Sequence, residues 1–132
     1  MTRFPLTGWL LVAGMALVGT GCQKDPASSI KPDVDNVRDR FHFQMSDVKN
    51  HDTLLVYYWQ MDGTSANIDQ SASIQGGTVT ITLEDDSQAQ VYQTDMTQNG
   101  SFVTTSGSAG MWRIRISLIH FTGMIDFRAQ RR

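Results

Sequence analysis

The chain has 132 residues, with 11 Lys and Arg against 13 Asp and Glu, and it contains one cysteine. This slightly negative charge argues against nucleic acid as a bulk partner, because domains that bind it usually carry a clear basic excess. A single cysteine excludes a disulfide within the chain. The length fits one ordinary domain once a short leader is removed.

The first 21 residues have the layout of an export signal. Arg3 is followed by a mainly apolar run from residue 6 to residue 18 and then by small residues up to Gly21. A run of this length is shorter than the roughly 20 apolar residues that a membrane-spanning helix needs. The order of basic, apolar and small residues therefore predicts a cleaved signal at residues 1–21.

The Val-Gly-Thr-Gly-Cys sequence at residues 18–22 resembles the lipobox of bacterial lipoproteins, with Gly19 where that family usually has Leu. The resemblance implies cleavage between Gly21 and Cys22 and acylation of the Cys22 thiol. Acyl chains anchor a protein because each buried CH₂ group contributes about 0.8 kcal/mol. An ordinary signal or an uncleaved anchor with an incidental cysteine is the alternative.

The residue after Cys22 bears on the destination. In the sorting rule of the lipoprotein family, Asp at this place favours retention in the inner membrane, and this chain has Gln23. The resemblance therefore implies the outer membrane, facing the periplasm or the cell surface. We expect residues 22–34, with their prolines, serines and alternating charges, to form the lipidated Cys22 and a flexible tether.

Residues 35–132 are predicted to form one all-β domain. Thr, Ser, Gln, Asp and Gly are abundant there, whereas strong helix formers are few. Period-two alternation and turn residues predict seven to eight short strands and no helix. This pattern favours an antiparallel β-sandwich, immunoglobulin-like or jelly-roll in kind. The predicted strands lie at 41–45, 54–59, 68–74, 78–83, 91–94, 101–105, 112–118 and 125–129.

The last two strands are predicted to form a tight hairpin that closes at Thr122-Gly123. Even positions are apolar before this turn and odd positions after it, so a hairpin places both apolar sets on one face. Residues 107–128 also resemble the closing hairpin of small bacterial β-sandwich modules, found on secreted proteases and in surface lipoproteins. This resemblance implies binding or scaffolding, and no catalytic residue carries over.

No catalytic or metal-binding pattern stands out. His42, His51 and His120 are scattered without a metal-ligand spacing, and Ser106 stands where a nucleophile elbow needs Gly. We therefore expect no enzyme activity, no metal and no cofactor apart from the lipid. Acidic side chains cluster at a predicted turn, namely Glu84, Asp85 and Asp86, and Asp62 and Asp69 lie in other loops. Such side chains are usually solvated, and calcium binding is the alternative interpretation.

Two surfaces are candidates for binding. The first is an aromatic platform of Tyr57, Tyr58 and Trp59, which stand in a continuous apolar run that alternation divides between two faces of a strand. Exposed rings bind sugars or proteins, although a covered strand is the alternative. The second is an anion-facing patch of Arg113, Arg115 and Arg128, for which a solvated face neutralised by nearby acids is the alternative.

These features together predict a non-enzymatic envelope lipoprotein whose sandwich binds or scaffolds a protein partner. A module that binds glycan or cell wall through exposed aromatics is the alternative function.

Overall fold

The computed structural model describes residues 31–132, so the predicted signal, its cleavage site at Gly21 and the lipidation site at Cys22 lie outside the described residues. The described part contains six strands and no helix, which confirms the all-β prediction. It accordingly holds no helix of the length and apolar character that crossing a membrane requires. The strands are β1 (Asp33–Val37), β2 (Arg40–Met61), β3 (Ala66–Glu84), β4 (Gln90–Thr94), β5 (Gly100–Val103) and β6 (Gly110–Arg131).

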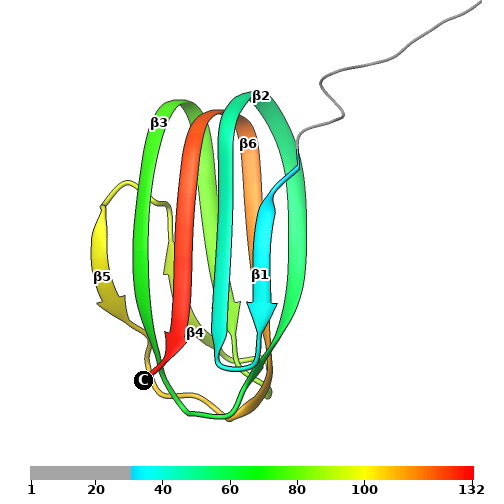
Figure 1. Cartoon of the computed structure of the whole chain (residues 1–132), viewed down its shortest axis with the longest axis vertical. Helices are drawn as coiled ribbons and strands as arrows, with labels where there is room; N and C mark the ends of the chain where they lie inside the picture. Colours follow the sequence, from blue (N-terminus) through cyan, green and yellow to red (C-terminus); the bar gives the residue numbers. More distant parts are fainter. Residues whose placement is uncertain (1–30) are drawn as a thin grey trace, which may run out of the picture. The chain divides into compact units, whose positions relative to one another are not determined.

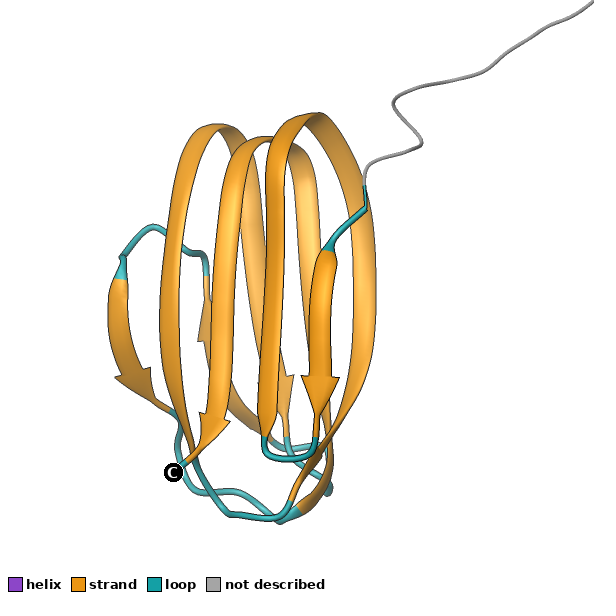
Figure 2. Ribbon diagram, viewed as in Figure 1, coloured by secondary structure: helices purple, strands orange, loops and turns teal. Residues whose placement is uncertain are grey.

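All strand pairs are antiparallel, in the order β1-β2-β6-β3-β4 with β5 also paired to β3. β2, β3 and β6 are long, and each arches over one end of the molecule so that its two halves run in different layers (Figure 1). Figure 2 shows that these arches are continuous strand, that most loops lie at the other end and that the β4–β5 loop lies along one side. The fold is therefore an antiparallel β-sandwich whose two layers share three strands.

Each layer is defined by the pairing register. In the first layer β6 lies between β2 and β3, with β1 and β5 at the two edges. In the second layer the same three strands keep this order, β4 pairs with β3, and β2 forms the opposite edge. The first layer comprises β1, β5 and residues 40–48, 66–76 and 122–131 of the long strands; the second comprises β4 and residues 51–61, 78–84 and 110–121.

The core lies between the layers and consists of alternate side chains from both. Trp59 and Trp112 meet edge to face, with ring centroids 5.9 Å apart. Such pairs contribute about 0.5–1.5 kcal/mol beyond the area they bury. The apolar residues predicted to share one face of the last two strands are all buried: Trp112, Ile114, Ile116, Leu118, Ile125, Phe127 and Ala129.

The predicted tight hairpin at Thr122-Gly123 is wrong. The two halves of β6 do not pair with each other, because the strand crosses from the second layer to the first and pairs with β2 and β3 in both. Irregular pairing in β2 and β3 at this level and positive φ angles at His120 and Gly123 accommodate the bend. The apolar positions change from even to odd numbers along β6, and this bend places both sets on the inner face just as a hairpin would.

The domain also begins earlier than predicted. β1 starts at Asp33, so Asp33 and Val34, which the sequence placed in the tether, pair with Gln44 and Phe43 of β2. The strands predicted at 78–83 and 91–94 pair as an antiparallel hairpin of β3 and β4, with Ile81 opposite Thr94 and a turn after Glu84.

Glycines allow β3 and β6 to approach closely at the arch. A Cβ atom on Gly123, whose φ is 144°, would lie 1.9 Å from the carbonyl oxygen of Ser73. A Cβ atom on Gly77, whose φ is 72°, would lie 2.2 Å from the carbonyl oxygen of His120. These contacts are with backbone, so side-chain movement does not relieve them.

We expect Gly123→Ala to lower the free energy of unfolding by about 1–3 kcal/mol or more, because it adds backbone strain and a steric overlap. Gly76→Ala is the matched control at the same arch, since its Cβ would lie 3.8 Å from the nearest atom. The control should stay within about 0.5 kcal/mol of the unchanged protein. Urea unfolding measures both, and equal losses would contradict this account of the arch.

Candidate functional site

The predicted aromatic platform is not formed. Trp59 is fully buried, and its indole N–H donates a hydrogen bond of 3.0 Å to the carbonyl of Val37. Tyr57 also points inward, with its ring centroid 5.5 Å from that of Phe41. Only Tyr58 is exposed. The alternation of the strand divides the three rings between its two faces. Tyr58 is therefore the one ring of the three that is available to stack on a sugar.

The outer face of β2 instead carries an apolar row, which comprises Leu54, Val56 and Tyr58. These side chains are 62%, 41% and 60% exposed, although they stand at alternate positions of one strand in the second layer. β1 does not cover them, because it pairs only with residues 40–44 of β2. The apolar row therefore lies along an edge strand.

The backbone at this edge is also open. Asn36 Nδ2 donates to the carbonyl of Tyr58 at 3.0 Å, and Asp39 N–H donates to that of Gln60 at 2.9 Å. These bonds show that even-numbered residues direct their backbone groups away from β6, since alternate residues of an antiparallel strand face opposite neighbours. By the same alternation, the N–H and C=O groups of Leu54 and Val56 point away from β6, and no strand within residues 31–132 pairs with them on that side. We call these groups the free edge.

Two of the three predicted arginines lie next to the apolar row. Arg113 is opposite Tyr58 and Arg115 is opposite Val56, and both contact Glu84 of β3. Arg113 Nε donates to Glu84 Oε1 at 2.7 Å, and this hydrogen bond is the main reason that the pKa of Arg113 is raised. Two guanidinium groups share one carboxylate, so the cluster keeps an excess of one positive charge.

Arg128 is not part of that patch, which corrects the prediction that three arginines project together. It lies on the first layer, where its Nε contacts Asp126 Oδ1 at 3.2 Å. The prediction failed because it rested on a hairpin, whereas β6 bends between layers and sends Arg128 to the other outer face. The acid that contacts both Arg113 and Arg115 is Glu84, and it neutralises one of their two charges.

The acidic residues after β3 are each held by different protein donors. Asp85 is buried and accepts hydrogen bonds from Ser87, Ala89 and Ser108, whereas Asp86 accepts one from the N–H of Met111. Among residues 31–132 no three His, Cys, Asp or Glu side chains are grouped closely enough to hold a metal ion. The other two acids considered also have partners: Asp62 forms an ion pair with Arg38, and Asp69 accepts a hydrogen bond from Ser101. Two of the histidines lie next to acids as well, His42 next to Asp126 and His120 next to Asp52.

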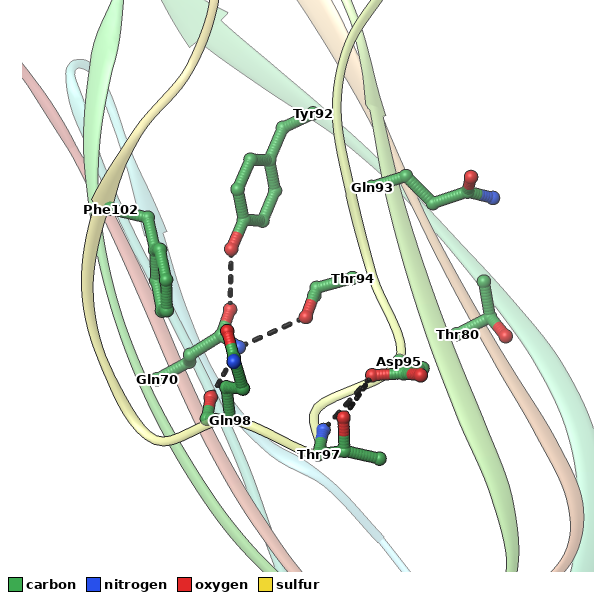
Figure 3. A pocket seen from close by; sticks show the side chains of 9 residues that line it. All are labelled: Gln70, Thr80, Tyr92, Gln93, Thr94, Asp95, Thr97, Gln98 and Phe102. Carbon is green, nitrogen blue, oxygen red and sulfur yellow. Dashed lines mark hydrogen bonds between the residues drawn. The ribbon is translucent and has the colours of Figure 1, made fainter.

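A polar hollow of about 620 Å³ lies beside β4 and β5, and its centre is the buried amide of Gln70. This amide donates to Thr94 Oγ1 at 2.9 Å and to the Gln98 carbonyl at 2.8 Å, and it accepts from the Tyr92 hydroxyl at 2.7 Å. Figure 3 shows the Gln70 amide at the hydroxyl end of the Tyr92 ring, with its hydrogen bonds to Tyr92, Thr94 and the Gln98 carbonyl. Because the amide has three protein partners, it serves as a clamp between β3, β4 and the segment after β4.

Comparison with known proteins adds no family: no protein-family model matches the chain, and the search of curated proteins found no significant match. The candidate site is therefore defined by geometry alone. It consists of the apolar row, the free edge and the two arginines beside them. Sequence analysis found the arginines and Tyr58 but missed the edge, because alternation does not reveal which strand lacks a neighbour.

Substitution of the two adjacent aromatics distinguishes the platform from the observed packing. Trp59→Ala should lower the free energy of unfolding by about 3–5 kcal/mol, because it leaves a cavity in the core. Tyr58→Ala should change it by less than about 0.5 kcal/mol, because the side chain is exposed. Thermal unfolding followed by circular dichroism measures both, and similar effects would contradict the inward position of Trp59.

The hydrogen bonds to Asp85 also predict a pH dependence. Donors led by Ser108 N–H and the Ser87 hydroxyl hold the pKa of Asp85 below its usual value, against the opposing effect of burial. A carboxyl whose pKa is lower in the folded state contributes stability above its unfolded pKa of about 3.9 and loses it as pH falls through the folded value. The Tm should therefore fall below about pH 4. This acid loss should be smaller in Asp85→Asn, which should have the lower Tm at pH 7, whereas Asp47→Asn at an exposed bend should keep the full acid loss.

Proposed function

We propose that this protein is a non-enzymatic lipoprotein of the cell envelope that binds a protein partner through the outer face of its second layer. The apolar row is the observation that carries the proposal. Three exposed apolar side chains in a line cost solvation free energy that burial against another protein recovers. Tyr and Arg, both present at this site, are the residues that most often dominate protein interfaces.

The charges around the apolar row support a partner of particular chemistry. Arg113 and Arg115 share the carboxylate of Glu84, which leaves one positive charge beside exposed Tyr58 and Val56. A partner with an apolar centre and a carboxylate at its rim would match this arrangement. Arg115 is the better placed donor, because its side chain is 42% exposed and its contact with Glu84 is long, at 3.4 Å.

Several polar groups of the described domain have structural partners, which supports binding over catalysis. Gln70 and Asp85 are buried and bonded to neighbouring strands and loops. His42 faces Asp126 at 3.0 Å on the first layer, whereas the apolar row lies on the second layer. A general base needs a nucleophile or substrate group within hydrogen-bond reach, and the apolar row offers it none.

The anchor is supported by the signal-like leader and by Cys22, as the sequence predicts. If the segment after Cys22 is the tether that its composition predicts, it would be a flexible chain, and the sandwich would sample many orientations near the membrane. The proposed lipoprotein would therefore present its second layer to a partner in the same compartment without a fixed docking angle.

Replacement of the proposed lipidation residue tests the anchor. Cys22→Ser should abolish labelling with a radioactive fatty acid and move the protein from the membrane pellet to the supernatant, because no thiol remains to be acylated. Ser106→Ala is the control and should leave both readouts unchanged. Retention of Cys22→Ser in the pellet would show that the leader acts as an uncleaved anchor.

Removal of the apolar row tests the binding surface. The combined change Leu54→Ser, Val56→Thr and Tyr58→Ser should reduce chemical crosslinking to a partner by at least about tenfold, which corresponds to about 1.4 kcal/mol. The matched control removes three exposed apolar side chains from elsewhere, namely Val37→Ser, Val103→Ser and Met124→Ser. Quantitative mass spectrometry of crosslinked envelopes measures both, and equal recovery from the two variants would refute this surface.

A further inference from the structure

The free edge of β2 is complementary to itself. We propose that two copies of this chain pair antiparallel through β2, about a two-fold axis at Leu55, and so join their second layers into one sheet. This inference rests on the proposed function, because it names a second copy as a partner of the same surface. The argument starts from which backbone groups are open.

The register follows from the hydrogen bonds already made. In an antiparallel pair, directly opposite residues alternate between pairs that exchange both backbone hydrogen bonds and pairs that exchange none. The carbonyls of Tyr58 and Gln60 already accept bonds from Asn36 and Asp39, so Leu54 and Val56 are the residues with both groups open. A two-fold arrangement that uses only these residues places Leu54 opposite Val56 of the second copy, and Val56 opposite its Leu54.

The side chains fit this register. On the outer face, the apolar rows of the two copies become neighbours, since Leu54 meets Val56 of the second copy in both directions. Opposite apolar pairs across neighbouring strands stabilise the pairing of those strands. On the inner face, Leu55 is half-buried and would meet its own equivalent on the axis. The pairing therefore covers apolar surface on both faces of the edge strand.

The charges fit as well. In this register Asp52, whose carboxylate is 59% exposed, comes opposite Tyr58 of the second copy. The neighbour of Tyr58 in β6 is Arg113, so an acid of one copy approaches the arginine pair of the other. The arginines of the two copies stay apart, because both β2 strands lie between them. Opposite charges at the ends of the pairing favour this alignment.

The pairing also resolves a hazard of the fold. An exposed apolar edge strand is a template for uncontrolled association, and natural proteins usually cover or charge such edges. A two-fold pairing buries the free edge of both copies and leaves none of it for a third copy to join. Anchoring in one membrane would raise the local concentration of copies and favour the pairing further. The joined apolar rows then form a wider surface for the proposed partner.

Engineered cysteines test the register. In the full chain carrying Cys22→Ser, Leu55→Cys should form a disulfide-linked dimer under mild oxidation. Opposite residues between hydrogen-bonded pairs have Cα atoms about 4.5 Å apart, which is within disulfide range. Thr53→Cys and Tyr57→Cys should crosslink when mixed with each other and not when alone. Val103→Cys, exposed on the first layer, is the control and should remain monomeric.

A proline substitution tests the backbone pairing without new thiols. Val56→Pro removes an N–H that points away from β6, and proline is tolerated at such edge positions. Sedimentation velocity of the full chain in detergent should show dimer for the unchanged protein and monomer for Val56→Pro, with circular dichroism confirming a folded sheet. If Val56→Pro does not fold, the cysteine experiment decides. A monomeric unchanged protein, or no crosslink at Leu55→Cys, would overturn the proposal.

The two proposals fail separately. Normal partner crosslinking by a monomeric protein would refute the pairing and leave the proposed function intact. Dimers that crosslink at Leu55→Cys, with partner recovery insensitive to the apolar row, would refute the proposed function alone.

Discussion

Close backbone contact between β3 and β6 at the arch is the constraint on which both layers depend. Gly77 and Gly123 leave no room for a Cβ atom, and the strands bend there without leaving the sheet. Because β6 changes layers at this point, the apolar side chains of both halves face the same interior. The core, the two outer faces and the edge position of β2 in the second layer all follow from that crossing.

Alternation in the sequence was sufficient for the fold class and for the buried faces. Trp112 to Leu118 and Ile125 to Ala129 are buried as their period predicted. The pattern did not distinguish a hairpin from a bend, since both reverse the parity of the apolar positions. One topological error then displaced Arg128 from the predicted patch, which shows that a site built from sequence inherits the connectivity assumed for it.

The candidate site shows a second limit of sequence reasoning. The continuous run from Leu54 to Trp59 carried the right residues, but the choice between core and surface depends on which face meets the opposite layer. Trp59 lies in the core and Leu54 on the surface. The acids Glu84, Asp85 and Asp86 are adjacent in sequence and contact an arginine pair, a loop and the start of β6 respectively. Such partners depend on tertiary contacts that local sequence does not encode.

β1 enters the sandwich differently from every long strand. It pairs with β2 alone, over five residues, whereas β2, β3 and β6 each run through both layers. Mechanical tension that arrives from the N-terminal side therefore reaches this short pairing first. Five residues of β1 can detach while the shared strands still hold the two layers together. Because the chain enters the domain through β1, tension on the N-terminal side can open the β1–β2 pairing without disrupting the core.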